Sequence, residues 1–166
     1  GRQMGKTLIL PVRWNLATAK PVLGINPAEK LLTNGIRGSL KYSDFEWCSW
    51  TNNDSVSFTI DLLKPEVLNT LTLGCITNNG MAIHKPASVK VEVSDDNSNF
   101  REAAMQSFTP EEIFREGNFI ENLPLKLGGT QGRYVRVSAK GPGVCPASHV
   151  RSGQASRIFF DEVMLE

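Results

Sequence analysis

Apolar residues recur at every second position in several short segments, and this period-two pattern constrains the fold of the chain more than any other feature. Residues 56–62, 71–75 and 89–93 alternate apolar with polar side chains, which is typical of strands with one buried face. Segments 134–138 and 158–165 are predicted to form two further strands. Strands separated by turn signals, without long helices between them, predict an antiparallel β-sandwich.

Two local motifs complete the expected secondary structure. The polar run 95–99 leads into Phe100 and predicts a hairpin turn; its start resembles a calcium-binding loop, but Phe100 stands where that loop needs glycine. Thr109 begins a capping box, with proline next and Glu112 three residues on. We expect this helix to end near Gly117 after about two turns. The chain is therefore predicted to be all-β with one short helix.

Length and charge exclude several classes of protein. A chain of 166 residues is expected to form one domain with a core that needs no disulfides. Its net charge of +1, without a dense basic cluster, argues against nucleic acid as a partner. No apolar run approaches the roughly 20 residues of a membrane span, so we expect no membrane insertion.

The chain also lacks the usual signatures of metal-dependent or nucleophilic catalysis. Cys48, Cys75 and Cys145 show no C-x-x-C spacing, so a zinc site is not expected and at most one disulfide can form. There is no G-x-S-x-G motif, no evident Cys/His pair and no clear pair of catalytic carboxylates. We therefore expect that the chain is not an enzyme.

A cation site is suggested by two segments at opposite ends of the chain. Glu162 lies within the apolar run 158–165, where a buried carboxylate needs a compensating charge. The glycine-rich turn 32–39 offers the oxygens of Asn34 and Ser39, the ligand type that calcium prefers. The alternative is that Glu162 pairs with a lysine or arginine and that Asn34 only supports a tight turn.

The order and spacing of five segments resemble the discoidin-like domains, also called coagulation factor V/VIII type C domains. Residues 15–22 look like the opening strand of that family, 32–39 like its L-T-D-G-I-R-G turn, and 56–62 like its v-t-I-D-L strand. Residues 86–96 are similar to its P-x-x-V-x-V-x-x-S-x-D-G hairpin, and 144–162 resemble the ending of modules appended to Bacteroidetes chitobiases, which are β-hexosaminidase-like enzymes.

The resemblance implies a galactose-binding-domain-like jelly-roll sandwich that carries a structural calcium ion. The ion would be held by Asn34, the carbonyl of Arg37, an oxygen of Ser39 and the carboxylate of Glu162. Asn34 replaces an aspartate of the family. Because calcium affinity follows the number of charged ligands, we expect this substitution to weaken the site.

The resemblance also implies a place within a larger protein. Residues 1–13 are expected to be a linker or a leading strand, and residues 14–166 the module itself. Because Gly1 does not look like a natural start, we expect an excised, monomeric piece of a bacterial glycoside hydrolase whose catalytic domain is its neighbour. The localisation implied is extracellular, periplasmic or on the outer-membrane surface.

Glycan binding is the function that the resemblance implies, as in the family-32-type carbohydrate-binding modules. Sugar recognition needs an aromatic face and planar hydrogen-bonding groups presented by loops. The predicted ligands are terminal galactose, N-acetylgalactosamine or N-acetylglucosamine, and the candidate contacts are Trp50, Asn79, His84, His149, Arg151 and Gln154.

Two other functions remain open for such a module. Related modules often carry aromatics around His84, and the smaller Met81 and Ala82 just before it remove a stacking platform. This absence favours a purely structural domain that packs on its catalytic neighbour. Trp47 corresponds to a tryptophan that mostly plugs one end of the sandwich, so it is a weaker candidate for sugar contact. Protein or lipid adhesion is the third reading, although the loop 47–53 lacks the basic neighbours that lipid binding requires.

Overall fold

The structure is a computed structural model that describes residues 13–16, 32, 35–51 and 55–166. Residues 1–12, most of the predicted leading segment 1–13, lie outside this part. The elements in chain order are β1 (Arg13–Leu16), β2 (Cys48–Thr51), β3 (Ser55–Asn78), the 3-10 turn η1 (Asn79–Met81), β4 (Ser88–Ser94), β5 (Phe100–Ser107), α2 (Pro110–Ile113), β6 (Asn118–Lys140) and β7 (Arg157–Leu165).

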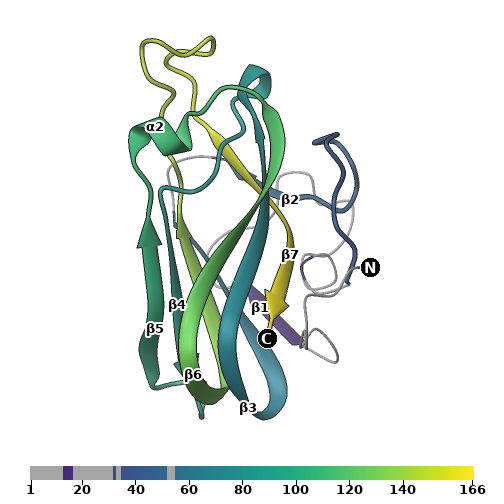
Figure 1. Cartoon of the computed structure of the whole chain (residues 1–166), viewed down its shortest axis with the longest axis vertical. Helices are drawn as coiled ribbons and strands as arrows, with labels where there is room; N and C mark the ends of the chain where they lie inside the picture. Colours follow the sequence, from purple (N-terminus) through teal and green to yellow (C-terminus); the bar gives the residue numbers. More distant parts are fainter. Residues whose placement is uncertain (1–12, 17–31, 33–34, 52–54) are drawn as a thin grey trace.

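The strands form an antiparallel sandwich, as predicted. Strand order is β2-β7-β3-β6-β4-β5, with β1 paired to β3, and every ladder between these strands is antiparallel. The first half of β3 pairs with β1 and the second half with β7, while β6 pairs with β3 along both halves and its second half also pairs with β4. The long strands β3 and β6 therefore run through both layers (Figure 1).

One expectation about the strands is wrong. Residues 56–62 and 71–75, expected as separate strands, are the two halves of the single strand β3. Its pairing with β6 shifts register between Asp61 and Glu66, and Leu63 there adopts a positive φ of 71°. These irregularities bend the strand from one layer into the other. In the sequence, the same stretch looks like a gap between two separate strands.

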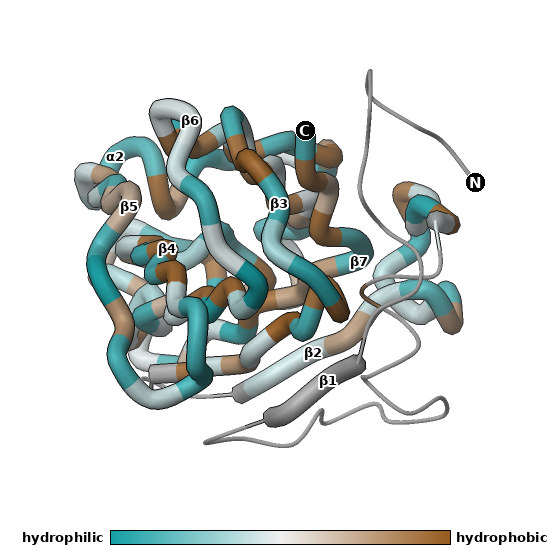
Figure 2. The backbone as a smooth tube through the Cα atoms, turned by 90° about the horizontal axis from the view of Figure 1, so that it is seen from below, coloured by the Kyte–Doolittle hydropathy of each residue, from teal (hydrophilic) through white to brown (hydrophobic). Residues whose placement is uncertain are grey.

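The core follows the period-two pattern of the strands, and hydrophobic and hydrophilic stretches alternate along the chain in Figure 2. In β4, Val89, Val91 and Val93 are buried and the residues between them only partly so. Strand β7 differs because its residues from Ile158 to Leu165 are all buried. Its Phe160 joins the main core, whereas Phe159 joins a second cluster.

That second cluster forms around Trp47, which is buried together with Ile76, Ile83 and Phe159. The indole Nε1 donates a hydrogen bond of 2.9 Å to the carbonyl of Ser39. The expectation that Trp47 plugs the sandwich rather than contacting a ligand agrees with this burial.

The predicted helix exists but is shorter than expected. Thr109 and Glu112 form the capping box, and α2 ends at Ile113, with Phe114 as the C-cap, instead of near Gly117. The ring of Phe114 packs edge-on against His84, with ring centroids 5.1 Å apart. This packing holds Phe114 against the sandwich and stops the helix early. No helix among the described residues is long and apolar enough to cross a bilayer.

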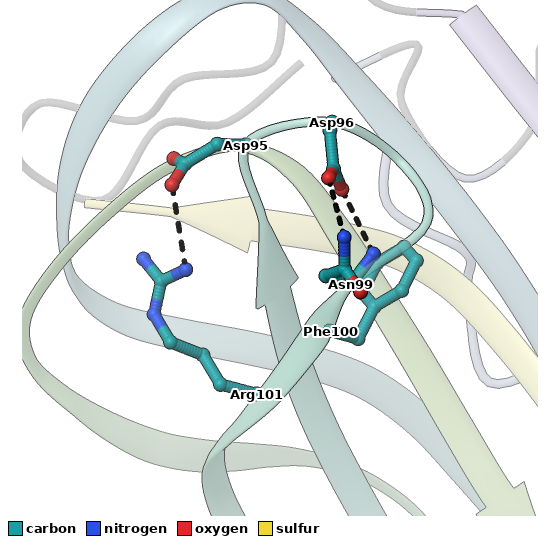
Figure 3. Close-up of a pocket in the computed structure, with 5 residues that line it drawn as sticks. All are labelled: Asp95, Asp96, Asn99, Phe100 and Arg101. Carbon is teal, nitrogen blue, oxygen red and sulfur yellow. Dashed lines mark hydrogen bonds and ion pairs between the residues drawn. The ribbon is translucent and has the colours of Figure 1, made fainter.

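The β4–β5 hairpin forms the predicted turn and contains a hollow of about 270 Å³, shown in Figure 3. Asp96 accepts hydrogen bonds from the backbone N–H groups of Ser98 and Asn99 and from the Asn99 side chain. These bonds hold the pKa of Asp96 below its usual range. Asp95 pairs with Arg101 at 3.7 Å. The carboxylates of this turn are thus occupied by the turn itself.

Candidate functional site

Two loops and the end of α2 meet at one end of the sandwich, opposite the β4–β5 hairpin (Figure 1). We call this surface the rim and define it as residues 79–81, 114–116 and 144–154. The segment 144–154 is held as a compact turn by two backbone hydrogen bonds. The N–H of Cys145 donates to the carbonyl of Gln154 at 2.8 Å, and the N–H of Gly153 donates to the carbonyl of Cys145 at 3.0 Å. The rim is therefore a fixed surface built from segments that are distant in the sequence.

Arg151 connects two parts of the rim. Its Nε donates a hydrogen bond of 2.7 Å to the carbonyl of Gly80, and its Nη1 lies 3.5 Å from Oε1 of Gln154. Both Arg151 and Gln154 are exposed. The structure thus places Arg151 and Gln154, two predicted contacts, beside each other with polar groups accessible to solvent.

A small hollow of about 60 Å³ opens in the rim. It is lined by Asn79, Phe114, Glu116, Pro146, Ser148 and His149. Oδ1 of Asn79 is buried and accepts no hydrogen bond from the described residues, so an acceptor is available there. Pockets for whole small molecules start near 300 Å³, so this hollow fits one substituent of a ligand that otherwise lies across the surface.

His84 lies beneath the rim, and its Nε2 forms a hydrogen bond of 2.9 Å with Nε2 of His149, which belongs to the rim. His149 Nδ1 accepts the backbone N–H of Arg151 at 2.8 Å. Neutral His149 therefore carries its proton on Nε2 and donates it to His84. Both rings pack edge-on against Phe114.

This placement corrects the predicted role of His84, whose side chain is 0% exposed and cannot contact a sugar. Burial, and then the nearby His149, lower the pKa of His84 to about 4. The backbone of Ile113 opposes this shift, although Nδ1 of His84 forms no hydrogen bond of good geometry. At neutral pH the ring is uncharged and supports the rim from below.

Trp50 also needs correction as a candidate sugar contact. It lies in strand β2 instead of a loop, is 2% exposed and belongs to the main core. Its ring packs against Phe160 with centroids 5.7 Å apart. The loop residues Asn52 and Asn53 beside it lie outside the described residues. No part of the indole face is open for stacking on a sugar.

The structure adds rim residues that the sequence did not suggest, and Phe114 is the most useful of them. It is only half-buried and lines the hollow, so it offers the apolar surface that Met81 and Ala82 lack. The sequence signal that could have pointed to Phe114 was the capping box, because the helix that it predicts was expected to extend past this residue. Glu116, Pro146 and Ser148 carry no sequence pattern that points to a site.

At the side of the sandwich, the turn after Gly35 meets the last strand. Gly35 donates its N–H to Oε2 of Glu162 at 2.5 Å, and Gly38 donates to Oδ2 of Asp161 at 2.8 Å. Arg37 binds the same Oδ2 through its Nε at 2.7 Å. The two segments expected to form a cation site thus lie together.

Only some of the predicted calcium ligands can be located. Asn34 lies outside the described residues. Ser39 is exposed, and its Oγ accepts the N–H of Lys41 at 3.2 Å. The side chain of Arg37 has a role that the sequence analysis missed, because it neutralises Asp161. Glu162 is fully buried and accepts the N–H of Gly35 from the turn.

Comparison with known families gives a match over most of the chain. The model of the F5/8 type C domain family matches residues 20–152. No curated protein matches the chain. The family resemblance expected from the sequence is therefore confirmed by the family match.

Solved structures are similar in fold. The module CpGH89CBM32-5 from Clostridium perfringens, in complex with GalNAc-β-1,3-galactose, has a TM-score of 0.56 and 16% identity, and 93% of this chain and 94% of that chain are covered. For the C-terminal domain of a chitobiase from Bacteroides fragilis the TM-score is 0.53 and the identity 16%, with 92% of each chain covered. GH31 CBM32-2 bound to GalNAc has a TM-score of 0.57 and 12% identity, and 93% of this chain and 96% of that chain are covered.

Proposed function

Because this chain belongs to the F5/8 type C domain family, we propose that it is a non-catalytic carbohydrate-binding module that binds terminal galactose or N-acetylhexosamine residues at the rim. The observation that carries the proposal is the buried, unpartnered Oδ1 of Asn79 in a rim hollow, close in the fold to the exposed Arg151 and Gln154. Similar structures were determined with GalNAc and with GalNAc-β-1,3-galactose bound.

The chemistry of the rim suits a sugar better than an apolar ligand. Oδ1 of Asn79 can accept a hydroxyl or amide proton, while Arg151 and Gln154 offer donors to ring hydroxyls. Phe114 supplies the apolar surface against which a sugar face or an N-acetyl methyl group would pack. The hollow of about 60 Å³ fits one such substituent and leaves most of the ring exposed, so we expect weak binding of a single sugar.

We place the module in a larger bacterial glycoside hydrolase of the chitobiase type, at the cell surface, in the periplasm or outside the cell. Similarity to the C-terminal domain of a chitobiase supports this placement. The module would hold its catalytic neighbour near glycans that carry the terminal sugar. Repeated weak contacts on one surface reach useful avidity through high effective concentration.

Asn79→Ala is expected to reduce glycan binding about tenfold without lowering the melting temperature. The substitution removes one hydrogen bond to the ligand, about 1.4 kcal/mol, and Oδ1 has no hydrogen bond in the free protein to lose. The measurement is a glycan array probed with multivalent protein, followed by titration of the selected sugar. Gln106→Ala, an exposed change on β5, is the matched control.

A folded sample that shows no selective signal on the array would contradict the proposal. The leading function would then be a structural domain that packs on its catalytic neighbour. The burial of Trp50 and His84, which removes two predicted contacts, is the observation that favours this second candidate.

Calcium remains a proposal for the turn beside β7. Glu162 would hold the cation together with Asn34, Ser39 and the carbonyl of Arg37, next to the ion pair of Arg37 with Asp161. The all-oxygen ligand set is typical of calcium. Because Asn34 replaces an aspartate, we expect the ion to bind weakly.

Glu162→Gln is expected to abolish the rise in melting temperature that calcium gives the wild type. The change keeps the volume of the side chain but removes the charge that a cation needs. Melting curves in calcium and in excess chelator measure the effect. Asp96→Asn, in the hairpin turn that resembles a calcium loop, should keep the full response. An equal calcium response in wild type and Glu162→Gln would exclude Glu162 as a ligand.

A further inference from the structure

A cluster of three buried side chains, two from the rim and one from beneath it, has the composition of a transition-metal site. His84, Cys145 and His149 are all buried, and each offers one ligand atom within 4.8 Å of the other two. Among the described residues this is the only group of three or more His, Cys, Asp or Glu side chains gathered so closely. The spacing of the cysteines in the sequence predicted no zinc site, because that rule detects only ligands that are near one another in the chain.

The donor set selects the class of metal. Two imidazole nitrogens and one thiolate suit Zn²⁺, whereas Ca²⁺ and Mg²⁺ require oxygen ligands. Cys145 is a free cysteine, and the other cysteines, Cys48 and Cys75, belong to the core, so a disulfide does not explain the position of its thiol. Neutral imidazoles are the metal-binding form of histidine.

The geometry lies close to that of a bound ion. Tetrahedral zinc with ordinary bond lengths separates its ligand atoms by about 3.3 to 3.6 Å. The two Nε2 atoms are 2.9 Å apart, and no pair of ligand atoms is separated by more than 4.8 Å. The imidazoles would separate by about half an ångström and the thiol would approach by up to about 1 Å, within the range of side-chain rotation.

A route to solvent and a fourth ligand position are also available. His149 lines the rim hollow of about 60 Å³ together with Glu116. Such a volume holds one or two water molecules, and the carboxylate of Glu116 at its wall attracts a cation. Three protein ligands with water in the fourth position form a common coordination sphere of zinc.

We propose that His84, Cys145 and His149 form a Zn²⁺ site that fastens the loop of residues 144–154 to the body of the sandwich. Binding replaces protons with the metal. The Cys145 thiol releases its proton to solvent as the Zn–S bond forms. The Nε2 proton of His149 moves to Nδ1, so that Nε2 presents its lone pair to the ion.

The proton transfer on His149 couples the metal to the rim. Nδ1 of His149 accepts the backbone N–H of Arg151 in the metal-free protein, and an Nδ1 that carries a proton cannot accept it. Zinc therefore breaks this hydrogen bond and shifts the backbone at Arg151, whose side chain spans the rim to Gly80. The site would regulate the surface that we propose for glycans, although the zinc proposal does not depend on glycan binding.

The test is titration of chelator-treated, reduced protein with ZnCl₂, compared between wild type and Cys145→Ser. We expect one equivalent to bind to wild type, and a rise in melting temperature of about 5 to 10 °C when free zinc is about 100 times Kd. Cys145→Ser keeps the volume and removes the thiolate, so its affinity should fall at least tenfold. Cys48→Ala, in the core, should keep the wild-type zinc affinity even if it lowers the melting temperature.

Two spectroscopic readouts distinguish this site from adventitious zinc. Co²⁺ substitution should give tetrahedral d–d bands and a thiolate charge-transfer band that Cys145→Ser lacks. NMR of the imidazole nitrogens should show the His149 proton moving from Nε2 to Nδ1, together with a shift of the Arg151 amide. Equal zinc affinities in wild type and Cys145→Ser, or the absence of stoichiometric binding, would overturn the proposal and leave the histidine pair as a hydrogen-bonded support of the rim.

Discussion

Arg37→Met is expected to lower the free energy of unfolding by about 3 to 5 kcal/mol, because it leaves a buried carboxylate without its cation. Asp161 is 0% exposed, and the Arg37 side chain over it is 8% exposed. Arg37 also bonds Asn122 at 2.6 Å. Methionine retains much of the apolar length of arginine but none of its charge. Urea denaturation followed by tryptophan fluorescence measures the change.

Two controls separate the buried charge from general effects of the substitution. Lys64→Met removes an exposed ion pair with Glu66 at 3.6 Å and should change stability by less than about 1 kcal/mol. Adding Asp161→Asn to Arg37→Met removes both charges and should recover part of the loss. A cost below about 1 kcal/mol for Arg37→Met would show that the pair contributes little to the stability of the fold.

Gly38→Ala is expected to destabilise the protein by about 2 to 4 kcal/mol, since the added methyl group would occupy space that the Trp47 indole fills. A Cβ at Gly38 would lie 2.3 Å from Cε2 and 2.4 Å from Nε1 of Trp47. The indole must move, which strains its packing and weakens its hydrogen bond to Ser39. The melting temperature should fall by about 5 to 15 °C.

Gly80→Ala is the matched control. A Cβ added at Gly80 would lie 3.7 Å from its nearest neighbour, Oδ1 of Asn78, which is an ordinary contact distance. This variant should melt within about 2 °C of wild type. A second variant, Trp47→Phe combined with Gly38→Ala, should lose less than the sum of the two single changes, since the smaller ring leaves room for the methyl group. Strict additivity of the two costs would argue against the steric explanation.

The strands were predictable because their signal is local. The valines of β4 alternate with polar residues, and this alternation alone locates the strand and its buried face. The capping box predicted the start of α2 for the same reason. The expectations that were wrong concern features set by contacts between residues that are distant in the sequence. The continuity of β3 comes from its bend between layers, and the end of α2 from the contact between Phe114 and His84.

The candidate site was predictable only in part. The candidate contacts were expected to be presented by loops, and the structure places Asn79, Arg151 and Gln154 together on the rim. The burial of Trp50 was not predictable, because a short strand gives no sign of being covered. The meeting of His84 with His149, 65 positions away, follows from the topology of the sandwich and has no local signal.

The two long strands have a further consequence. β3 and β6 each belong to both layers, so neither layer can detach while the other stays intact, and the sandwich opens as one cooperative unit. The rim begins only where β3 ends, at Asn78. Substitutions can therefore accumulate in the rim loops while the folding of the sandwich stays unchanged.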